Sequence, residues 1–207
     1  MNKNKYYSLW LALICILVFI LQTIIPRFTE IFILNSGAFE QPYRFLTAIF
    51  LHSSITHLFY NLFALIFFGL ILEKFIGSFR FLLIFLISGI LANLLAVNFY
   101  PASLGASGAI FGVIGALTVI KPLMIVWAFS LPMPLFFASF LWVLGDLLGF
   151  FYAQDNIGHL THIAGLVFGI IFSLMSKIQI KKKKKQRDYK IKIPEREIRI
   201  WEDFYMR

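Results

Sequence analysis

Apolar residues form six long runs along the chain, and short groups of charged or polar residues separate each run from the next. The runs cover about 8–26, 55–73, 79–99, 105–120, 134–152 and 158–176. Each approaches the ~20 residues that an α-helix needs to cross a bilayer. A span in lipid must satisfy its own backbone hydrogen bonds, and no segment alternates like a barrel strand. The pattern therefore predicts an all-α membrane protein with a bundle of six transmembrane helices.

Three segments outside this regular pattern need separate interpretation. Residues 27–54 are polar and are expected outside the bilayer. Residues 123–133 are apolar but short, and Pro132 and Pro134 would break a spanning helix, so we expect an interfacial segment there. Lysines precede the first run, as they do in a secretory signal, but the run is longer than a signal core and lacks a small-residue cleavage site. We therefore expect a retained first span.

The composition supports the membrane interpretation. Sixty per cent of the residues are hydrophobic and 14% are charged, and the mean hydropathy is +0.83. A soluble domain of this length could not bury so much apolar surface. The single cysteine, Cys15, has no partner in the chain, so no disulfide is expected. The length fits one membrane domain, residues 1–177, followed by a basic tail, residues 178–207.

Basic residues indicate how the bundle is oriented. With a cytoplasmic N-terminus, six spans return the C-terminus to the cytoplasm, and Arg27 and Arg44 are the only basic loop residues on the outer side. The inner side then carries Lys3, Lys5, Lys74, Arg80, Lys121, Lys177 and the tail. Because cytoplasmic loops are enriched in Lys and Arg, we expect a multi-pass protein of the cell membrane with both termini inside.

The tail begins with a run of basic residues, Lys181–Lys185, which supplies much of the net charge of +9. This run would bind anionic lipid headgroups, or it would act as a stop-transfer anchor that reinforces the topology, and we favour the anchor. Because the positive charge is concentrated in the tail, it does not indicate nucleic-acid binding.

Strongly polar residues are costly inside a span, which makes them candidates for a functional site. Asn61, Ser107 and His162 stand 13, 14 and 15 residues before the basic residues that end their spans. At ~1.5 Å per residue, all three lie about 20–23 Å above the inner face, and His57 lies one turn farther out. Three separate spans thus place polar groups at one depth. This agreement predicts a site in one layer near the outer surface.

The chemistry available in this layer is that of serine, histidine and asparagine. Ser107 lies between Gly105 and Gly108, where backbones can approach closely. A nearby histidine could take the proton of its hydroxyl as a general base, and Asn61 and His57 could donate hydrogen bonds to an oxyanion. Two histidines without a carboxylate or cysteine form a poor metal site. No cofactor is expected.

Small residues indicate that the fourth and sixth spans pack closely. Gly108 and Gly112 are four residues apart in one span, and Gly165 and Gly169 are four apart in the other. Such faces let two helices approach closely. We expect this approach to allow a hydrogen bond between Ser107 and an imidazole.

These residues resemble the rhomboid family of intramembrane serine proteases over about residues 5–177. The segment Gly105–Ala109 is similar to the GxSG nucleophile motif, and Thr161–Gly165 with Gly169 is similar to the AHxxG motif of the last core helix. His57 and Asn61 match HxxxN. Tyr43-Arg44 stands where the family usually has Trp-Arg, Thr161 stands for the usual Ala, and Glu73 matches an acidic residue that ends the second helix.

The resemblance implies a rhomboid-like six-helix bundle and an endopeptidase that cleaves transmembrane or juxtamembrane segments of membrane proteins near the outer leaflet. Ser107 would be the nucleophile and His162 the general base and acid. Asn61, with His57 and the backbone N–H of Ser107, would stabilise the oxyanion. Because family members use a dyad, Asp146 is interpreted as a structural or loop-orienting residue.

Two other functions fit the sequence less well than a protease does. A catalytically inactive relative that only binds transmembrane helices is disfavoured by the intact Ser, His and Asn. A small transporter or channel is disfavoured by the lack of charged pathway residues and paired broken helices. His52 is interpreted as a solvated or hydrogen-bonded histidine, and His159 as a neighbour of the base. The fifth span starts at a Pro-broken segment and has few polar anchors, so we expect it to gate lateral access.

Overall fold

The computed structural model describes residues 6–153, 155, 157–188, 196 and 199. Contacts divide the chain into two compact units, Met1–Leu174 and Met175–Arg207. The first unit contains the helices and the candidate site. In the second unit, residues 175–188 continue helix α8, which runs from His159 to Asp188. The rest of the predicted tail, apart from residues 196 and 199, lies outside the described residues.

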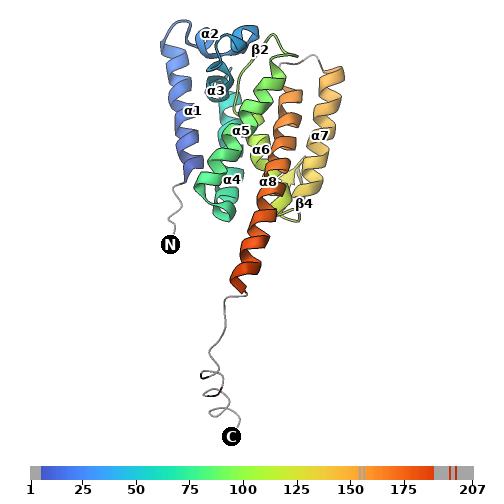
Figure 1. The fold of residues 1–207 in the computed structure, drawn as a ribbon. Helices are drawn as coiled ribbons and strands as arrows, with labels where there is room; N and C mark the ends of the chain where they lie inside the picture. The colour runs from blue at the N-terminus through green and yellow to red at the C-terminus, as the bar shows by residue number, and fades with distance from the viewer. Residues whose placement is uncertain (1–5, 154, 156, 189–195, 197–198, 200–207) are drawn as a thin grey trace. The chain divides into compact units, whose positions relative to one another are not determined.

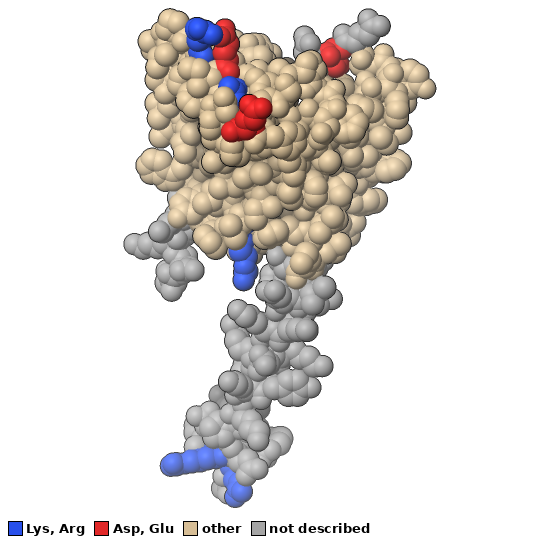
Figure 2. Space-filling view, turned by 45° about the horizontal axis from the view of Figure 1, so that its top comes forward, with Lys and Arg blue, Asp and Glu red and all other residues tan. Residues whose placement is uncertain are grey.

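Helices occupy all six apolar runs, and those of the first unit lie side by side (Figure 1). Within the described residues, four helices are long and apolar enough to cross a membrane. They are α1 (Tyr7–Ile24), α4 (Ile55–Ile76), α5 (Ser78–Ala96) and α7 (Leu135–Tyr152). Two shorter apolar helices are α6 (Ser107–Ile120) and the His159–Met175 part of α8. On the face drawn in Figure 2, charged side chains lie toward the ends of a broad tan body. These features describe a mostly helical, multi-pass membrane protein.

Several helix boundaries differ from the predicted runs, including the ends of α1, α4 and α8, and two of the differences have local reasons. The fourth run was predicted from residue 105, but α6 begins at Ser107 because Gly105 has a φ of +124°. The third run was predicted to residue 99, but α5 ends at Ala96. A turn follows, in which the Asn98 side chain donates to the Leu94 carbonyl (3.0 Å).

The polar segment 27–54 folds into short elements at one end of the bundle. These are α2 (Phe28–Phe32), β1 (Leu34–Asn35), η1 (Ser36–Phe39), α3 (Arg44–Thr47) and η2 (Ala48–Phe50). Strand β1 pairs antiparallel with β2 (Ala102–Ser103), which joins this segment to the loop before α6. The buried Arg44 donates from Nη1 to the carbonyls of Glu30 (2.9 Å) and Ile33 (2.7 Å). Arg44 thereby ties together the chain segment that covers this end.

The segment predicted to be interfacial forms a β-hairpin. Strands β3 (Ile125–Ala128) and β4 (Leu131–Pro134) pair antiparallel, with Val126 opposite Met133. Phe129 and Ser130 form the two-residue turn and have φ values of 53° and 62°, as a type I′ turn requires. Val126 and Met133 pack into the core. Pro132 and Pro134 exclude a helix here but are tolerated in a short edge strand.

Helix α6 lies at the centre of the bundle. Its buried residues run from Gly108 to Leu117 and face several directions, as expected for a helix that is surrounded by other helices. Gly89 of α5 faces Ala109, where an added Cβ would lie 2.9 Å from the Ala109 Cβ. In contrast, most of α1 and α7 is not covered by protein. Ser107, the first residue of α6, therefore lies on the most enclosed helix.

A buried carboxylate connects the end of α4 to the start of α1. Glu73 is 1% exposed and accepts hydrogen bonds from the backbone N–H groups of Tyr7 (2.9 Å) and Ser8 (3.1 Å) and from the Ser8 hydroxyl (3.0 Å). The first N–H groups of a helix have no intrahelical acceptor and favour negative charge. Glu73 therefore satisfies the N-terminus of α1 and holds α1 against α4.

Candidate active site

The predicted site residues lie near the N-terminal ends of three helices. His57 is on the first turn of α4, Ser107 begins α6, and His162 is on the first turn of α8. The chain enters α6 through Gly105, whose φ of +124° is one that residues with a side chain rarely adopt. A Cβ at Gly105 would lie 2.8 Å from the His57 ring and 3.9 Å from Ser107 Oγ. This glycine thus lets the imidazole of His57 lie beside the serine.

Glycines bring the backbones of α6 and α8 into direct contact. A Cβ added at Gly165 would collide with the carbonyl oxygen of Gly108, and one added at Gly169 would collide with that of Gly112. Gly108 in turn faces Thr161, whose Cγ2 would lie 2.8 Å from an added Cβ. Ser107 precedes Gly108 and His162 follows Thr161, so the serine and the histidine lie on neighbouring positions of two touching helices.

The His162 ring is held from two sides. It stacks on Phe111, with 4.4 Å between ring centroids and 2° between planes. Phe111 is one turn after Ser107 on the same face of α6. On the other side, His162 Nδ1 lies 3.1 Å from Oδ1 of Asp146 on α7. The ring therefore has a defined orientation beside the start of α6.

Among the described residues, no hydrogen bond joins Ser107 to His162. Ser107 is half-buried. Hydrogen bonds between a catalytic nucleophile and its base are often long in unliganded sites and shorten when substrate binds. The geometry that bears on a reaction between these residues is therefore the contact of α6 with α8 and the orientation of the His162 ring.

Asn61 and His57 lie on the same face of α4, one turn apart. Asn61 is buried, and its side-chain nitrogen donates to the His57 carbonyl (3.0 Å), which uses one of its two N–H groups. His57 Nδ1 lies 3.1 Å from the Ser53 hydroxyl. The rings of His57 and His162 are close enough to interact electrostatically. These contacts leave a donor of Asn61 and the Nε2 side of His57 for a ligand.

His52 was expected to be a solvated or hydrogen-bonded histidine, and the structure shows that it is hydrogen-bonded and not solvated. It is 1% exposed, and its ring lies edge-on to His57 with 5.1 Å between centroids. Its Nδ1 lies 3.2 Å from the Phe50 carbonyl, whereas its buried Nε2 has no partner among the described residues. Burial, together with the neighbouring His57, lowers the pKa of His52 to about 4. His52 is therefore a neutral wall of the site at physiological pH.

A second group of charged residues lies next to His162. Asp146 Oδ1 is 2.8 Å from His159 Nδ1 as well as 3.1 Å from His162 Nδ1. His159 Nε2 is 3.2 Å from Asp155 Oδ1, and its ring fills the space beside Gly149. From the sequence, Asp146 was expected to be a structural residue and His159 a neighbour of the base, with no link between them. The sequence indicates only part of this arrangement. The three-residue spacing of His159 and His162 puts both on one face of α8, but it does not show that Asp146 contacts them.

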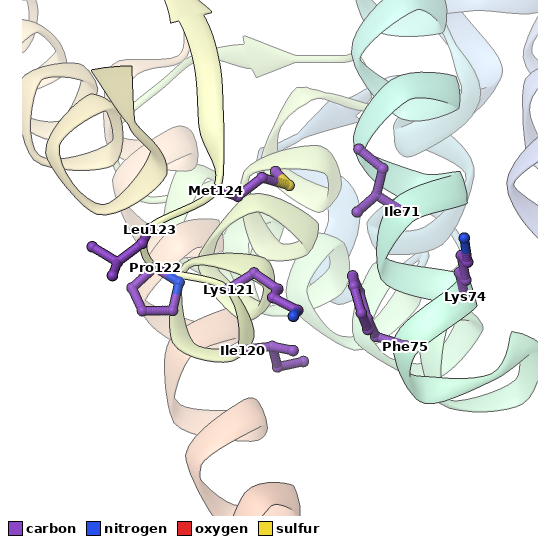
Figure 3. Close-up of a pocket in the computed structure, with 8 residues that line it drawn as sticks. All are labelled: Ile71, Lys74, Phe75, Ile120, Lys121, Pro122, Leu123 and Met124. Carbon is purple, nitrogen blue, oxygen red and sulfur yellow. The ribbon is translucent and has the colours of Figure 1, made fainter. Parts of the chain in front are cut away.

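A separate pocket of about 660 Å³ lies between the C-terminal ends of α4 and α6, away from His57 and Ser107 (Figure 3). It is lined by Ile71, Lys74, Phe75, Ile120, Lys121, Pro122, Leu123 and Met124. The Lys121 ammonium lies 4.8 Å from the centre of the Phe75 ring. Lys121 is 14 residues from Ser107, or about 20 Å along α6. The residues that line this pocket include no serine, threonine, cysteine or histidine, so it is distinct from the candidate active site.

Comparison with known proteins gives matches over most of the helical region. A family model described as the Rhomboid domain matches residues 40–178. Rhomboid protease GluP of Bacillus subtilis (strain 168) is 38% identical over 128 residues, which cover 61% of this chain and 24% of the relative. Rhomboid-like protease 3 of Toxoplasma gondii is 28% identical over 174 residues, which cover 78% of this chain and 65% of the relative.

Not every similar protein is named as an active enzyme. Inactive RHOMBOID-like protein 8 of Arabidopsis thaliana is 43% identical over 77 residues, which cover 36% of this chain and 22% of the relative. The matches span less than two thirds of the length of each of these relatives. The domain match covers more than half of the chain and contains the three helix ends that form the candidate site. This multi-pass membrane protein therefore belongs to the rhomboid family.

Proposed function

We propose that this protein is an intramembrane serine endopeptidase that cleaves transmembrane or juxtamembrane segments of other membrane proteins. The observation that carries this proposal is the contact between α6 and α8. In support of it, Gly108, the residue after Ser107, packs against Thr161 and Gly165 of α8, and the His162 imidazole stacks on Phe111. Similarity to relatives that are named proteases supports the same reaction class.

In the proposed mechanism, Ser107 Oγ attacks the carbonyl carbon of the scissile peptide bond. The hydroxyl proton passes to His162 Nε2, and the π electrons of the carbonyl move onto its oxygen. When the tetrahedral intermediate collapses, the C–N bond breaks and His162 gives the proton to the leaving amine. Water then attacks the acyl-enzyme with His162 again as base, which releases the acid product and restores Ser107.

Hydrogen-bond donors near Ser107 would stabilise the negative oxygen of the intermediate. The first hydrogen bond within α6 runs from the Ile110 N–H to the Ala106 carbonyl (2.9 Å), so the N–H groups at the start of the helix have no intrahelical acceptor. The Ser107 N–H is one of them. The second N–H of the Asn61 amide and the Nε2 of His57 add donors from α4. Fixed donors of this kind usually contribute most to acyl-transfer catalysis.

Orientation in the membrane is also part of the proposal. Lys74 and Lys121 end α4 and α6, and Arg80 is on the first turn of α5. All three lie at the bundle end opposite Ser107. Because basic residues favour the cytoplasm, we infer that residues 1–177 form the six-span protease domain in the cell membrane, with cytoplasmic termini. Cleavage then occurs near the outer leaflet. Lys181–Lys185 would lie at the inner surface as an anchor that contacts anionic headgroups.

Labelling with a fluorophosphonate probe tests the proposed function, because the probe reacts with an activated serine. We expect the purified protein in detergent or proteoliposomes to be labelled. Labelling should disappear in Ser107→Ala and in His162→Ala, each checked for an unchanged elution volume and thermal transition. A well-folded wild type that is not labelled would overturn this proposal and would instead indicate an inactive relative that only binds transmembrane helices. One similar protein is named as inactive.

A further inference from the structure

Asp146 is a carboxylate on a lipid-crossing helix that the proposed serine–histidine pair does not require. It is buried, at 8% exposure, within α7. Burying a carboxylate is costly unless hydrogen bonds compensate it, and ionisable residues at such positions are functional candidates by default. Among the residues that the structure describes, its partners are His159 and His162, both through Oδ1. The partners of Asp146 therefore include the imidazole that the proposed mechanism uses as its base.

The hydrogen-bond chemistry of these groups defines which nitrogen of His162 carries the proton. An ionised carboxylate only accepts hydrogen bonds, so the nitrogen of His162 that faces Asp146, Nδ1, must be the donor. In the neutral ring, Nε2 is then the unprotonated nitrogen with a free lone pair. That is the atom that must accept the Ser107 proton. The opposite tautomer would put a lone pair against the carboxylate and leave no base for the serine.

We propose that Asp146 is a positioning residue that holds His162 in the Nδ1–H tautomer and stabilises the imidazolium formed when His162 takes the proton from Ser107. This inference rests on the proposed function and adds a third residue to the pair. Asp146 does not touch the substrate and does not itself take up the proton, as in other Ser-His-Asp arrangements. It acts through the 3.1 Å contact with His162.

The charges around His162 agree with this role. His159 lies between Asp146 and Asp155, with one ring nitrogen facing each carboxylate. A carboxylate in direct contact with His162 stabilises the imidazolium that forms when the serine proton is transferred. The other titratable groups nearby are His57, which interacts with His162 electrostatically, and Tyr100, whose hydroxyl accepts from the Leu160 N–H.

Tyr100 does not compete for this charge at neutral pH. It follows α5 outside the spanning helices, and burial, together with the charges of Asp146 and Asp155, raises its pKa. Its phenol therefore stays neutral. The carboxylate of Asp146 is left as the charged group in direct contact with His162.

A purely structural role for Asp146, in which it only fastens α7 to α8, makes a different prediction. A structural residue would change the amount of folded protein or its thermal transition, but it would not change the protonation of His162. A positioning residue would change the pH dependence of the reaction at Ser107. Asp146→Asn separates the two roles, because the amide keeps the size and one acceptor atom but removes the charge.

The experiment measures the rate constant of fluorophosphonate labelling between about pH 5 and 9 for the full chain in proteoliposomes. For Asp146→Asn we expect labelling at neutral pH to fall by about 10²- to 10⁴-fold, in line with the loss of the carboxylate in serine proteases. The rising limb of the pH profile should also move to lower pH, because a neutral amide stabilises the imidazolium less than a carboxylate does.

The matched control is Ser139→Ala, which also removes a buried polar contact between α7 and α6. Ser139 Oγ lies 2.7 Å from Thr118 Oγ1, away from His162. We expect its labelling rate to stay within about twofold of wild type with an unchanged profile. Histidine ¹⁵N shifts in the Ser107→Ala background provide a readout that does not depend on activity. His162 should be the Nδ1–H tautomer, and Asp146→Asn should populate the Nε2–H form.

The outcomes for this inference and for the proposed function can be told apart. If the wild type is not labelled at all, the protease proposal fails. If wild-type labelling depends on Ser107 but Asp146→Asn matches the wild type in rate and profile, only the role of Asp146 is overturned. A lower rate with an unmoved profile and an unchanged His162 tautomer would also overturn it and leave Asp146 as a structural link.

Discussion

Replacing Glu73 by glutamine removes a charge that three donors at the start of α1 share. In the wild type, Glu73 Oε1 accepts from the Tyr7 N–H, and Oε2 accepts from both the N–H and the hydroxyl of Ser8. Glutamine retains one oxygen, but its amide NH₂ must then face one of these N–H groups. The change therefore weakens every bond in the group and brings two donors together.

The size of the effect follows from the three bonds. A hydrogen bond to a charged group contributes about 1.5–3 kcal/mol and a neutral one about 0.5–1.5 kcal/mol. Each of the three bonds therefore loses about 1 kcal/mol, and we expect the free energy of unfolding to fall by about 3 kcal/mol. Most of α1 is not covered by protein, so few other contacts compensate for a loosened α1.

The assay is equilibrium unfolding in mixed micelles, with Ser8→Ala as the matched control. That change removes only the hydroxyl bond to the charged carboxylate and should cost about 1.5–3 kcal/mol. The double variant should cost less than the sum of the two single changes, because both act on the same contact. Glu73 is 16 residues from His57, or about 24 Å along α4. Below the unfolding transition, fluorophosphonate labelling of Ser107 should therefore be unchanged.

A loss below about 0.5 kcal/mol in Glu73→Gln would refute this reasoning, because it is the size expected for a surface substitution. Strict additivity with Ser8→Ala would also contradict it. Loss of labelling in a protein that is still folded would show that Glu73 affects the active site.

The remaining predictions concern the site and its access. Gly165→Ala places a methyl group against the Gly108 carbonyl and should lower the Ser107 labelling rate by about tenfold or more. Gly145→Ala, whose Cβ meets no atom within 4 Å, should label like the wild type, and equal rates for the two variants would contradict the role of this contact. Burial lowers the pKa of His52 to about 4, below its value of about 6.5 in the unfolded chain. His52 therefore does not change the free energy of unfolding above about pH 6.5. As the pH drops from there toward 4, this free energy falls by up to about 3 kcal/mol. His52→Gln should remove this slope from a pH titration of unfolding, and an unchanged slope would assign it to other groups. The rings of Phe68 on α4 and Trp142 on α7 are 6.3 Å apart. Both positions can be changed to cysteine in a Cys15→Ala background and joined by a thiol cross-linker. The cross-link should block cleavage of a transmembrane substrate but should not block labelling of Ser107 by the probe. Full cleavage after cross-linking would exclude a lateral gate between these helices.

The positions of the helices could be predicted from sequence because a membrane span is a local property. The length of an apolar run determines whether a helix can cross the bilayer, and helices occupy all six runs. The ends of the helices were harder to predict. At Gly105, for example, a positive φ makes α6 begin later in the chain than predicted. The hairpin at Ile125–Pro134 was missed as strands, because its two prolines disfavour both regular structures.

The residues of the candidate site could be predicted from sequence because residue type and depth in the membrane follow from positions along a single helix. Counting from boundary lysines grouped Asn61, Ser107 and His162 in one layer, and glycine spacing indicated which helices approach each other. Neither signal shows in which direction a side chain points around its helix. The stacking of His162 on Phe111 and the burial of His52 beside His57 depend on that direction.

For this protein, the sequence alone determined its membrane character, the six apolar runs and the serine, histidine and asparagine that resemble a protease motif. These properties depend on residue type and on spacing within one helix. Tertiary structure alone decided that Asp146 of α7 contacts His162 of α8, and that Glu73 binds the start of α1. Both carboxylates act across helices that are distant in sequence. Such contacts are set by how the helices pack and rotate against one another, which no local pattern of residues records.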